Sequence, residues 1–595
     1  MSDRTYLKAA EGLKSNARQW EAYESTGHCV VLAGPGSGKT KTLTTKLARI
    51  LAEDVEEPRG VACITFNNEC AKELEDRLAK LGVETSSRVF IGTVHSFSLT
   101  QIILPYARVA DMGLPDAFEV ASKAERLESL TAAANRVMDE PGDLSALDGR
   151  MGQYRRAHVD RESAAWQDTD SHLAALAEAY ETELRDRGLI DFDDMPLLAF
   201  RALTAHAWLR KALLAKFPVL VVDEYQDLGI ALHRIVMSLC FTTGVRLFAV
   251  GDVDQSIYGF TGARPELLRR LSEREDVQTV RLRLNYRSGN GIVAASRVAL
   301  GEDRDYTAAD QDARGLVFVH ALGGSLESQA RFLLRELLPE SLERCDGLGL
   351  GDVAVLYQAA YLGDMVADAA RELGLPYVRT DGNALYPRSS RLMQWLESCG
   401  RWCCGGWRSG NPRFSRLMSD GHRLFATALC SDAERTAFHR AVVEVLWRTR
   451  NPALSLHDWL HGLHAIFEPL AERCTGMREE MQTYSRFANR VAPAGDHAGT
   501  SLGEFAGEGQ HLQRLMLSTL HSAKGREFGI VFMFAMDHGK LPRFSDTPRQ
   551  KQEARRLFYV GITRAQFEVH LVHSTGRASM FVAEIQAHLE ELDGH

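Results

Sequence analysis

The chain has 595 residues, which is more than one hydrophobic core normally serves, so we expect several domains or subdomains. Its 45% hydrophobic and 25% charged residues are typical of a globular protein. A net charge of −9 excludes a general basic field, so any nucleic-acid contact has to depend on local patches. Ten scattered cysteines, no apolar leader at Met1–Arg4 and no run of about 18 apolar residues predict a cytoplasmic protein without a membrane partner.

The first motif follows an apolar run at residues 30–33, which we interpret as a buried strand. It has the G-x-x-x-x-G-K-T pattern, with Ala33 in the first place, and comprises Gly34, Pro35, Gly36, Ser37, Gly38, Lys39 and Thr40. The backbone N–H groups of such a turn cradle a polyphosphate, and the glycines allow close approach. Lys39 would reach the β and γ oxygens, and the Thr40 hydroxyl would ligate Mg²⁺. The motif predicts a nucleoside triphosphate site.

Further apolar runs predict the rest of the α/β framework. Residues 219–222 lead into Asp223-Glu224, and residues 247–250 lead into Gly251-Asp252. Short apolar strands separated by helical stretches indicate a parallel sheet, with the chemistry at the carboxyl ends of its strands. We expect Asp223 to hold Mg²⁺ and Glu224 to position and deprotonate the attacking water. Similar runs at 353–356, 530–534 and 567–572 predict a second α/β core.

Each core is interrupted by an insertion that we expect to be mainly helical. The first is rich in Ala, Leu, Glu and Arg, lacks strand runs and has helical periodicity at 171–188. The second holds five of the eight tryptophans and ends in a Gly/Pro/Ala-rich connector at 492–509. The predicted domains are a first ATPase domain at 1–105 and 205–285 with its insertion at 106–204, and a second domain at 286–385 and 510–595 with a reduced insertion at 386–509.

Two arginines of the second core, Arg287 and Arg564, are candidates to stabilise the charge on the transferred phosphoryl group. An arginine in this role accelerates hydrolysis by roughly 10³–10⁵. Because both would come from the second core, hydrolysis would depend on closing the two cores around the nucleotide.

These motifs together resemble the UvrD/Rep group of superfamily 1 DNA helicases, in the same order, from about residue 13 to 574. The matching stretches are 16–19 (Q motif), 33–40 (I), 65–71 (Ia), 92–97 (Ib), 223–227 (II), 251–260 (III), 285–288 (IV), 519–528 (V) and 553–565 (VI), and 191–194 also has a counterpart. The resemblance implies an α/β fold of two RecA-like, parallel-sheet P-loop NTPase domains that use ATP and Mg²⁺.

The resemblance also implies roles around the nucleotide. Gln19 would bind the adenine edge and Tyr286 would stack on the ring. Glu527 would bond the ribose, and Gln255 would sense the γ-phosphate and report it to the DNA side.

Other residues are implied to contact DNA. Phe66, Tyr258 and Phe260 would form platforms for unpaired bases, since base–aromatic stacking contributes about 1–3 kcal/mol per base. Core packing is the alternative for each aromatic residue. The remaining implied contacts are Asn67, His95 and His521, although a single histidine is more often structural.

The sequence departs from the family in three ways. Thr261 follows Phe260 where the family has Trp-Arg, so a cation for phosphate is lost and the grip on DNA would weaken. The second insertion is short, and the family's glycine-rich duplex motif is not recognisable in it. Because the sequence runs only a short way past motif VI, we do not expect partnerships that depend on a C-terminal tail.

The resulting hypothesis is an ATP-dependent 3′-to-5′ DNA helicase and translocase, which acts on single-stranded DNA and single/double-strand junctions in repair, recombination or anti-phage defence. The alternative is a DNA-sensing ATPase subunit that regulates a partner nuclease in a defence complex such as Gabija. The truncated second insertion favours this alternative, whereas an RNA-directed ATPase is disfavoured because the motifs resemble the DNA branch.

Residues 388–418 form a further feature, with three tryptophans among many arginines. Trp395, Trp402 and Trp407 alternate with six arginines (Arg388, Arg391, Arg401, Arg408, Arg413 and Arg416) against one acid, Glu397. Three interpretations stay open: a helix pair with Trp inside and Arg outside, a DNA contact, or a protein interface.

Overall fold

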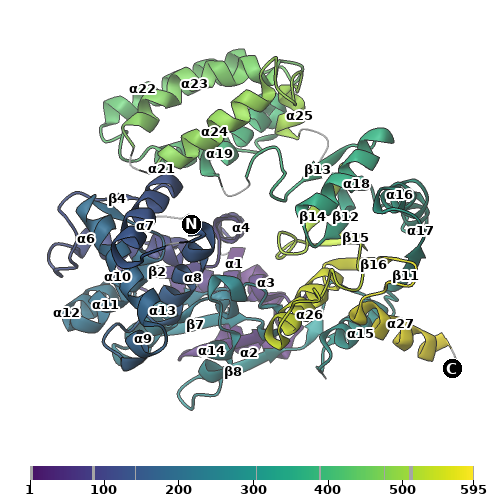
Figure 1. Cartoon of the computed structure of the whole chain (residues 1–595), viewed down its shortest axis with the longest axis horizontal. Coiled ribbons are helices and arrows are strands. Elements are labelled where there is room, and N and C mark those ends of the chain that lie inside the picture. The colour runs from purple at the N-terminus through teal and green to yellow at the C-terminus, as the bar shows by residue number, and fades with distance from the viewer. Residues whose placement is uncertain are drawn as a thin grey trace. The chain divides into compact units, whose positions relative to one another are not determined.

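The computed structural model describes residues 5–83, 88–140, 142–302, 304–387, 390–474, 476–507 and 513–593, without the side chains of Phe260 and Asp593 (Figure 1). Two compact units are present. The first comprises Met1–Phe118, Glu125–Leu322 and Ala523–His595, and the second comprises Glu119–Ala124 and Gly323–Ser522. No helix in the described ranges is long and apolar enough to cross a bilayer. The predicted four-part domain division was drawn from motifs, and it stays a prediction.

Six parallel strands form the main sheet of the first unit, in the order β3-β2-β6-β7-β1-β8. Their bounds are β1 (Cys29–Ala33), β2 (Val61–Thr65), β3 (Val89–Thr93), β6 (Val219–Val222), β7 (Arg246–Gly251) and β8 (Gln278–Leu282). The predicted strands at 30–33, 219–222 and 247–250 are therefore confirmed. Because all six run parallel, the loops that follow β1, β6 and β7 emerge at one edge of the sheet.

Alternate residues of these strands enter two different hydrophobic layers, one on each face of the sheet. Val30 and Val222 belong to one layer, whereas Val31 and Val221 belong to the other, and all four are fully buried. Burying one such side chain contributes about 1.5–3 kcal/mol relative to exposure. Burial on both faces explains why these strands appear in the sequence as continuous apolar runs.

Helices cover this sheet, and several change to π or 3₁₀ geometry at an end. They are α1 (Thr5–Glu11), α2 (Ala17–Glu24), α3 (Lys39–Arg49), η1 (Ile50–Asp54), α4 (Asn68–Lys80), α5 (Val94–Phe97), η2 (Ser98–Ile103), α6 (Leu104–Tyr106), α11 (Asp194–Ala205), α12 (Ala207–Lys216), η3 (Tyr225–Asp227), α13 (Ile230–Val236), η4 (Met237–Thr242), η5 (Val253–Gln255), η6 (Gly259–Thr261) and α14 (Pro265–Ser272).

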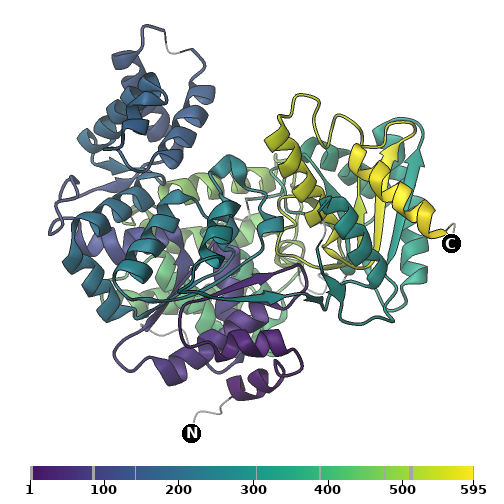
Figure 2. The same ribbon diagram turned by 90° about the horizontal axis from the view of Figure 1, so that it is seen from below.

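The first insertion is mainly helical, as predicted, and its helices stand together beside the sheet in Figure 2. They are α7 (Lys123–Val137), α8 (Leu144–Ala157), α9 (Ala164–Asp168) and α10 (Ser171–Asp186), with two short strands, β4 (Glu119–Val120) and β5 (Leu189–Ile190). The expectation that this insertion lacks strands is wrong, since β4 and β5 are present. Each has only two residues, which is too short to produce a recognisable apolar run in the sequence. Arg155, which is 2% exposed, binds Asp191 and Asp194 and so fixes the turn that ends the insertion.

The first unit also contains the strand trio β11-β16-β15 and the small parallel pair β9-β10. The elements are β9 (Leu284–Asn285), α15 (Asn290–Leu300), β10 (Thr307–Ala308), β11 (Leu316–Leu322), β15 (Phe528–Met533), α26 (Pro548–Ile562), β16 (Ala565–Ser574) and α27 (Met580–Asp593). The trio is parallel, so the predicted α/β character extends beyond the first sheet.

The second unit has its own parallel trio, β12-β14-β13, and its own helical core. The α/β part contains α16 (Leu326–Phe332), η7 (Leu333–Leu337), α17 (Leu338–Arg344), η8 (Leu350–Asp352), β12 (Val353–Tyr357), α18 (Ala360–Glu372), β13 (Tyr377–Arg379) and β14 (Leu515–Thr519). The helical part contains α19 (Arg391–Arg401), η9 (Trp402–Gly406), α20 (Trp407–Ser409), α21 (Phe414–Leu424), α22 (Asp432–Arg448), α23 (Leu456–Glu472), α24 (Arg478–Val491) and α25 (Leu502–Ala506). The predicted connector thus contains a short helix, α25. Taken together, the fold is α/β and consistent with two RecA-like domains.

Candidate nucleotide and nucleic-acid site

The glycine-rich turn joins the end of β1 to the first residue of α3. Gly36 and Gly38 have φ of 67° and 82°, in the left-handed region that favours glycine. The Ser37 hydroxyl donates to the Gly34 carbonyl (2.7 Å) and braces the turn. The free N–H groups and the positive end of the α3 dipole therefore face one point, which suits a phosphate anion.

The Lys39 ammonium is buried and lies at long ion-pair distance from two carboxylates. Its Nζ lies 4.0 Å from Glu224 Oε1 and 3.9 Å from Asp252 Oδ2, and its side chain is 13% exposed. Among the residues that the structure describes, this Nζ has no hydrogen-bond partner. A buried ammonium without a partner is costly, so the geometry fits an anion supplied by a ligand, such as the phosphates of ATP.

The acidic side of the site comes from the loops after β6 and β7. Burial and the neighbouring Glu224 charge raise the pKa of Asp223. Burial opposes ionisation of Glu224 as well, but Lys39 and Lys524 overcome it and lower the pKa of Glu224. Glu224 adopts φ of 49°, a strained conformation for a residue other than glycine and one that is common at functional sites. The pair thus contains an ionised carboxylate, as a general base requires.

Gln255 links this acidic group to Arg564. Its Nε2 donates to Asp252 Oδ2 (2.6 Å), and its Oε1 accepts from Arg564 Nη2 (3.1 Å). Arg564 is 2% exposed and is held by the carbonyl of Val560 (3.0 Å). The structure thus brings together Lys39, Glu224, Gln255 and Arg564 within the first unit.

Arg287 lies against the phosphate loop, where a Cβ on Gly36 would be 2.8 Å from its side chain. Asn285 Oδ1 accepts from Arg287 N (2.7 Å), and the neighbouring Tyr286 N donates to Gly36 O (2.8 Å). The Arg287 guanidinium pairs with Glu527 and donates to Thr563 O (2.9 Å), while its buried Nε has no partner in the described part of the chain. The structure therefore brings Glu527 into contact with Arg287.

The residues expected around the adenine lie beside the same loop. Gln19 is buried and donates from Nε2 to Ser37 O (2.8 Å). Asn16 Nδ2 donates to the Tyr286 hydroxyl (2.9 Å), and Asn16 Oδ1 caps α2. The Tyr286 ring is 51% exposed, so its surface is available to an aromatic base.

The expected DNA contacts do not form a single cluster of described side chains. The Phe66 and Tyr258 rings stack on each other, 4.5 Å between centroids and 24° apart. Asn67 caps α4 by accepting from Cys70 N (2.8 Å). His95 contacts Phe192 edge to face at 5.7 Å. The Phe260 side chain lies outside the described residues, and His521 belongs to the second unit.

Matches to known families agree with this geometry. The model described as UvrD/REP helicase N-terminal domain matches residues 15–276, and the model described as UvrD-like helicase C-terminal domain matches residues 498–575. The chain belongs to the UvrD/Rep helicase family. The two matches include the phosphate loop, both acidic loops, Arg564 and Glu527.

Curated members of this helicase family match over most of the chain. ATP-dependent DNA helicase Rep of Escherichia coli (strain K12) is 25% identical, over 94% of this chain and 90% of the relative. ATP-dependent DNA helicase PcrA of Leuconostoc citreum is 26% identical, over 97% and 85%. PcrA of Staphylococcus aureus (strain Mu50) is 24% identical, over 94% and 83%.

Three residues of this UvrD/Rep-type site were missed by the sequence reasoning. Lys524 pairs with Asp227, donates to Gln255 O (2.6 Å) and lies 5.2 Å from the centre of the Tyr258 ring. It stands inside motif V, so the motif itself was the available signal.

Tyr306 and Arg304 had no signal in the sequence, because they follow α15 in a stretch without a motif. The Tyr306 ring packs on Gly34 so closely that a Cβ there would lie 2.5 Å from it. Arg304 binds both oxygens of Asp254, at 2.8 and 2.9 Å. This segment therefore contacts both the phosphate loop and motif III.

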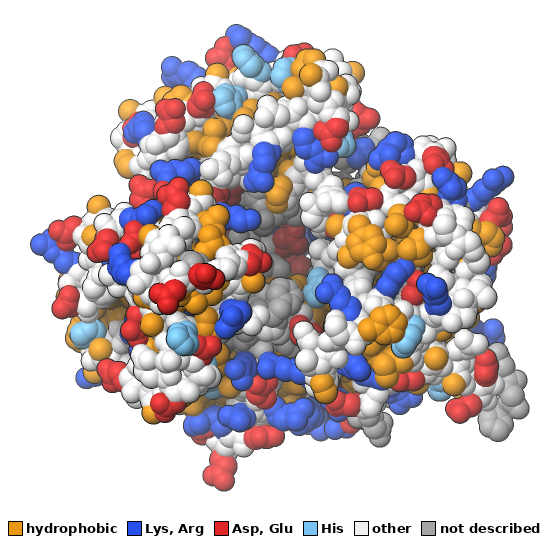
Figure 3. Space-filling model, in the orientation of Figure 1, with side chains coloured by type: hydrophobic (Ala, Val, Ile, Leu, Met, Phe, Trp, Pro, Cys, Tyr) orange, Lys and Arg blue, Asp and Glu red, His pale blue; other side chains and the backbone are white. Residues whose placement is uncertain are grey.

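In the described ranges, no group of three or more His, Cys, Asp or Glu side chains is arranged to hold a metal ion. Mg²⁺ commonly uses only one or two carboxylates together with substrate phosphates, so Thr40 and Asp223 stay predicted Mg²⁺ ligands. Figure 3 shows acidic and basic side chains interspersed over the face in view, in keeping with the absence of a general basic field.

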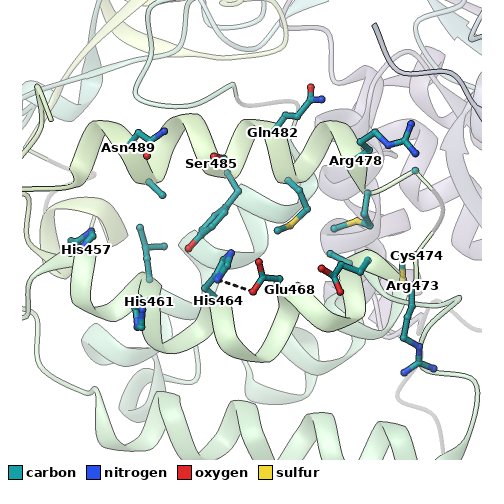
Figure 4. Close-up of a pocket in the computed structure, with 18 of the residues that line it drawn as sticks. His457, His461, His464, Glu468, Arg473, Cys474, Arg478, Gln482, Ser485 and Asn489 are labelled. Carbon is teal, nitrogen blue, oxygen red and sulfur yellow. Dashed lines mark ion pairs between the residues drawn. The ribbon is translucent and has the colours of Figure 1, made fainter. Parts of the chain in front are cut away.

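A cavity of about 740 Å³ lies in the second unit, between α23 and α24 (Figure 4). His464 faces Glu468 at 3.5 Å in it and stacks on the Tyr484 ring at 5.1 Å. None of the predicted site residues lines this cavity, so it is separate from the nucleotide site.

One prediction concerns the helix that supports motif II. His233 Nδ1 lies 2.8 Å from the hydroxyl of buried Tyr225, and burial lowers the pKa of His233 to about 4. The unfolded chain binds this proton near pH 6.5, so the stability contributed by neutral His233 is lost as the pH falls from about 6.5 to about 4. Between pH 7.5 and 5, we expect the wild type to lose about 2 kcal/mol more than His233→Gln in urea unfolding. If the free energies of unfolding of the wild type and His233→Gln change by the same amount over this pH range, the prediction is wrong.

Proposed function

We propose that the protein is an ATP-dependent 3′-to-5′ DNA translocase that separates duplex DNA. The observation that carries the proposal is the buried ammonium of Lys39, which lacks a hydrogen-bond partner in the described part of the chain. It lies beside Glu224 and Asp252 and is connected to Arg564 through Gln255. ATP hydrolysis needs a phosphate cradle, a base and cations for the developing charge, and the residues around Lys39 suit all three requirements.

The proposed division of roles follows from these positions. Lys39 and the loop N–H groups bind the β- and γ-phosphates, and Glu224 takes the proton of the attacking water. Thr40 and Asp223 would hold Mg²⁺, which neutralises phosphate charge when bound. Arg287 and Arg564 stabilise the charge that develops on the transferred group.

Coupling to DNA is proposed to run through Gln255 and Lys524. The Gln255 side-chain amide forms hydrogen bonds with both Asp252 and Arg564, so loss of the γ-phosphate would change its hydrogen bonding. Lys524 bonds the Gln255 carbonyl and lies over the Tyr258 ring, which stacks on Phe66. Unpaired bases would bind beside these two rings and near the exposed Phe192, with Asn67, His95, Phe260 and His521 as further contacts.

Binding of DNA rather than another ligand, and the 3′-to-5′ direction, rest on the resemblance to the UvrD/Rep helicases. Tyr306 and Arg304 are proposed as positioning residues, because Tyr306 packs on Gly34 and Arg304 binds Asp254.

Turnover is predicted to depend on the two residues at the centre of the site. Lys39→Ala removes the phosphate cation, and Glu224→Gln removes the base, so each should lower kcat by 10²-fold or more, about the contribution of a positioned group. Glu224→Gln should still bind ATP, measured by calorimetry. The control Lys41→Ala changes an exposed lysine of the same helix that bonds Gly12 O, and should hydrolyse ATP normally. Retained hydrolysis in either site variant would show that the site is misplaced.

The polarity is tested with duplexes that carry a single-stranded tail on one end. We expect single-stranded DNA to stimulate ATP hydrolysis, and unwinding of 3′-tailed substrates in preference to 5′-tailed ones. The Glu224→Gln variant, which should not turn over ATP, gives the background level of strand separation in this assay. Absence of stimulation, or exclusive opening of 5′-tailed duplexes, would contradict the proposal.

A further inference from the structure

The Trp/Arg-rich segment divides into a buried part and a surface part. Trp395 and Trp402 are 3% and 7% exposed and belong to the helical core of the second unit. For these two tryptophans, the interpretation of a helix pair with Trp inside is confirmed. Trp407 is only half-buried, and Arg388 lies outside the described residues.

Trp407 meets a second tryptophan that the sequence pattern did not group with it. Trp447, at the end of α22, lies 6.1 Å from Trp407 between ring centroids. The Arg450 guanidinium lies 3.4 Å from the Trp447 centroid and 4.5 Å from the Trp407 centroid, and Arg408 lies 4.6 Å over Trp407. These cation–π contacts hold the rings in place before any partner arrives.

The exposed face continues along α22. Val443 is 40% and Trp447 is 54% exposed, and they stand four residues apart on one helix face. Between residues 390 and 507, as far as the structure describes them, these are the large hydrophobic side chains that remain exposed. We call the set formed by Trp407, Arg408, Val443, Trp447, Arg448 and Arg450 the tryptophan–arginine patch.

We propose that this patch docks an acidic, apolar-anchored segment of a partner protein. Tryptophan and arginine dominate the residues that contribute most to protein interfaces. The patch carries three arginines, and Arg440 lies on the same helix face one turn before Val443. The nearby acid, Glu444, is already paired with Arg448 at 2.7 Å. The surface is therefore basic with an apolar centre, which is complementary to acidic side chains around an apolar residue.

Charge and ring geometry disfavour two other occupants. A second copy of this chain bound face to face would bring arginines against arginines. A nucleic-acid base needs an open ring face, whereas Arg450 covers one face of Trp447, and Trp402 and Trp407 also contact that ring. The proposal is independent of the ATP site and goes beyond the proposed helicase activity.

The test uses the full-length protein and a fluorescein-labelled 16-residue helical peptide, rich in Glu, with Leu at positions i and i+4. Its counterpart has every Glu replaced by Gln. We expect fluorescence anisotropy to show that the protein binds the Glu peptide and does not bind the Gln peptide. Trp447→Ala and Arg450→Ala should weaken binding by about tenfold or more.

Matched controls separate docking from folding. Trp208→Ala in α12 removes another exposed tryptophan, which is 40% exposed, and Arg486→Ala in α24 removes another exposed arginine. Both should bind the Glu peptide normally. Val443→Asp adds a negative charge at an exposed position, so it should repel the peptide while its thermal melt stays that of the wild type.

Several outcomes would overturn the proposal. Equal binding of the Gln peptide, no binding of the Glu peptide, or unchanged binding by Val443→Asp would exclude acidic docking. Weaker affinity of Trp447→Ala for single-stranded or duplex DNA would assign the patch to nucleic acid. Dimerisation in sedimentation that Val443→Asp abolishes would assign it to a second copy of the chain.

Discussion

The positive charge of Lys39 is the constraint on which the rest of the structure depends. Three parallel strands, β1, β6 and β7, end around this ammonium, and two carboxylates approach it without reaching hydrogen-bond distance. Burying an ion without a hydrogen-bond partner is unfavourable, so the fold maintains a site that is suited to an anionic ligand. The strained Glu224 and the left-handed glycines are consequences of the same arrangement, because they direct the base and the loop amides toward one point. Binding energy from the phosphates is then available to organise the surrounding side chains.

The side chains around Lys39 form a continuous path through the first unit. Asp252, Gln255 and Arg564 are joined by successive hydrogen bonds, and Lys524 connects Gln255 to the ring of Tyr258. These contacts connect the surroundings of Lys39 to the stacked rings of Phe66 and Tyr258, which is the route that the proposed coupling uses. Both candidate arginines are restrained, Arg564 by backbone carbonyls and Arg287 by Glu527. Restraint of this kind lowers the cost of orienting a cation in the transition state.

The sequence predicts the strands and the glycine-rich turn well, because both depend on local patterns, whereas the phosphate at that turn stays a prediction. Residues 219–222 are buried on both faces and are continuously apolar, and residues 34–38 form a turn whose left-handed positions are taken by glycines. The contacts between segments far apart in the sequence required the structure. Tyr306 reaches Gly34 from a stretch without a motif, and Arg450 joins Trp407 to Trp447 although they are 40 residues apart. The stacking of Phe66 on Tyr258 could not be predicted from the sequence either. Each motif predicts an aromatic residue but does not say which other ring it contacts.

The most direct test is a structure of Glu224→Gln with ATP and Mg²⁺ bound. The account predicts that Lys39 Nζ and the guanidinium groups of Arg287 and Arg564 lie within hydrogen-bond distance of the β- or γ-phosphate oxygens. The adenine ring should lie beside Tyr286. A nucleotide bound elsewhere, or one bound by Lys39 while both arginines point away from its phosphates, would contradict it.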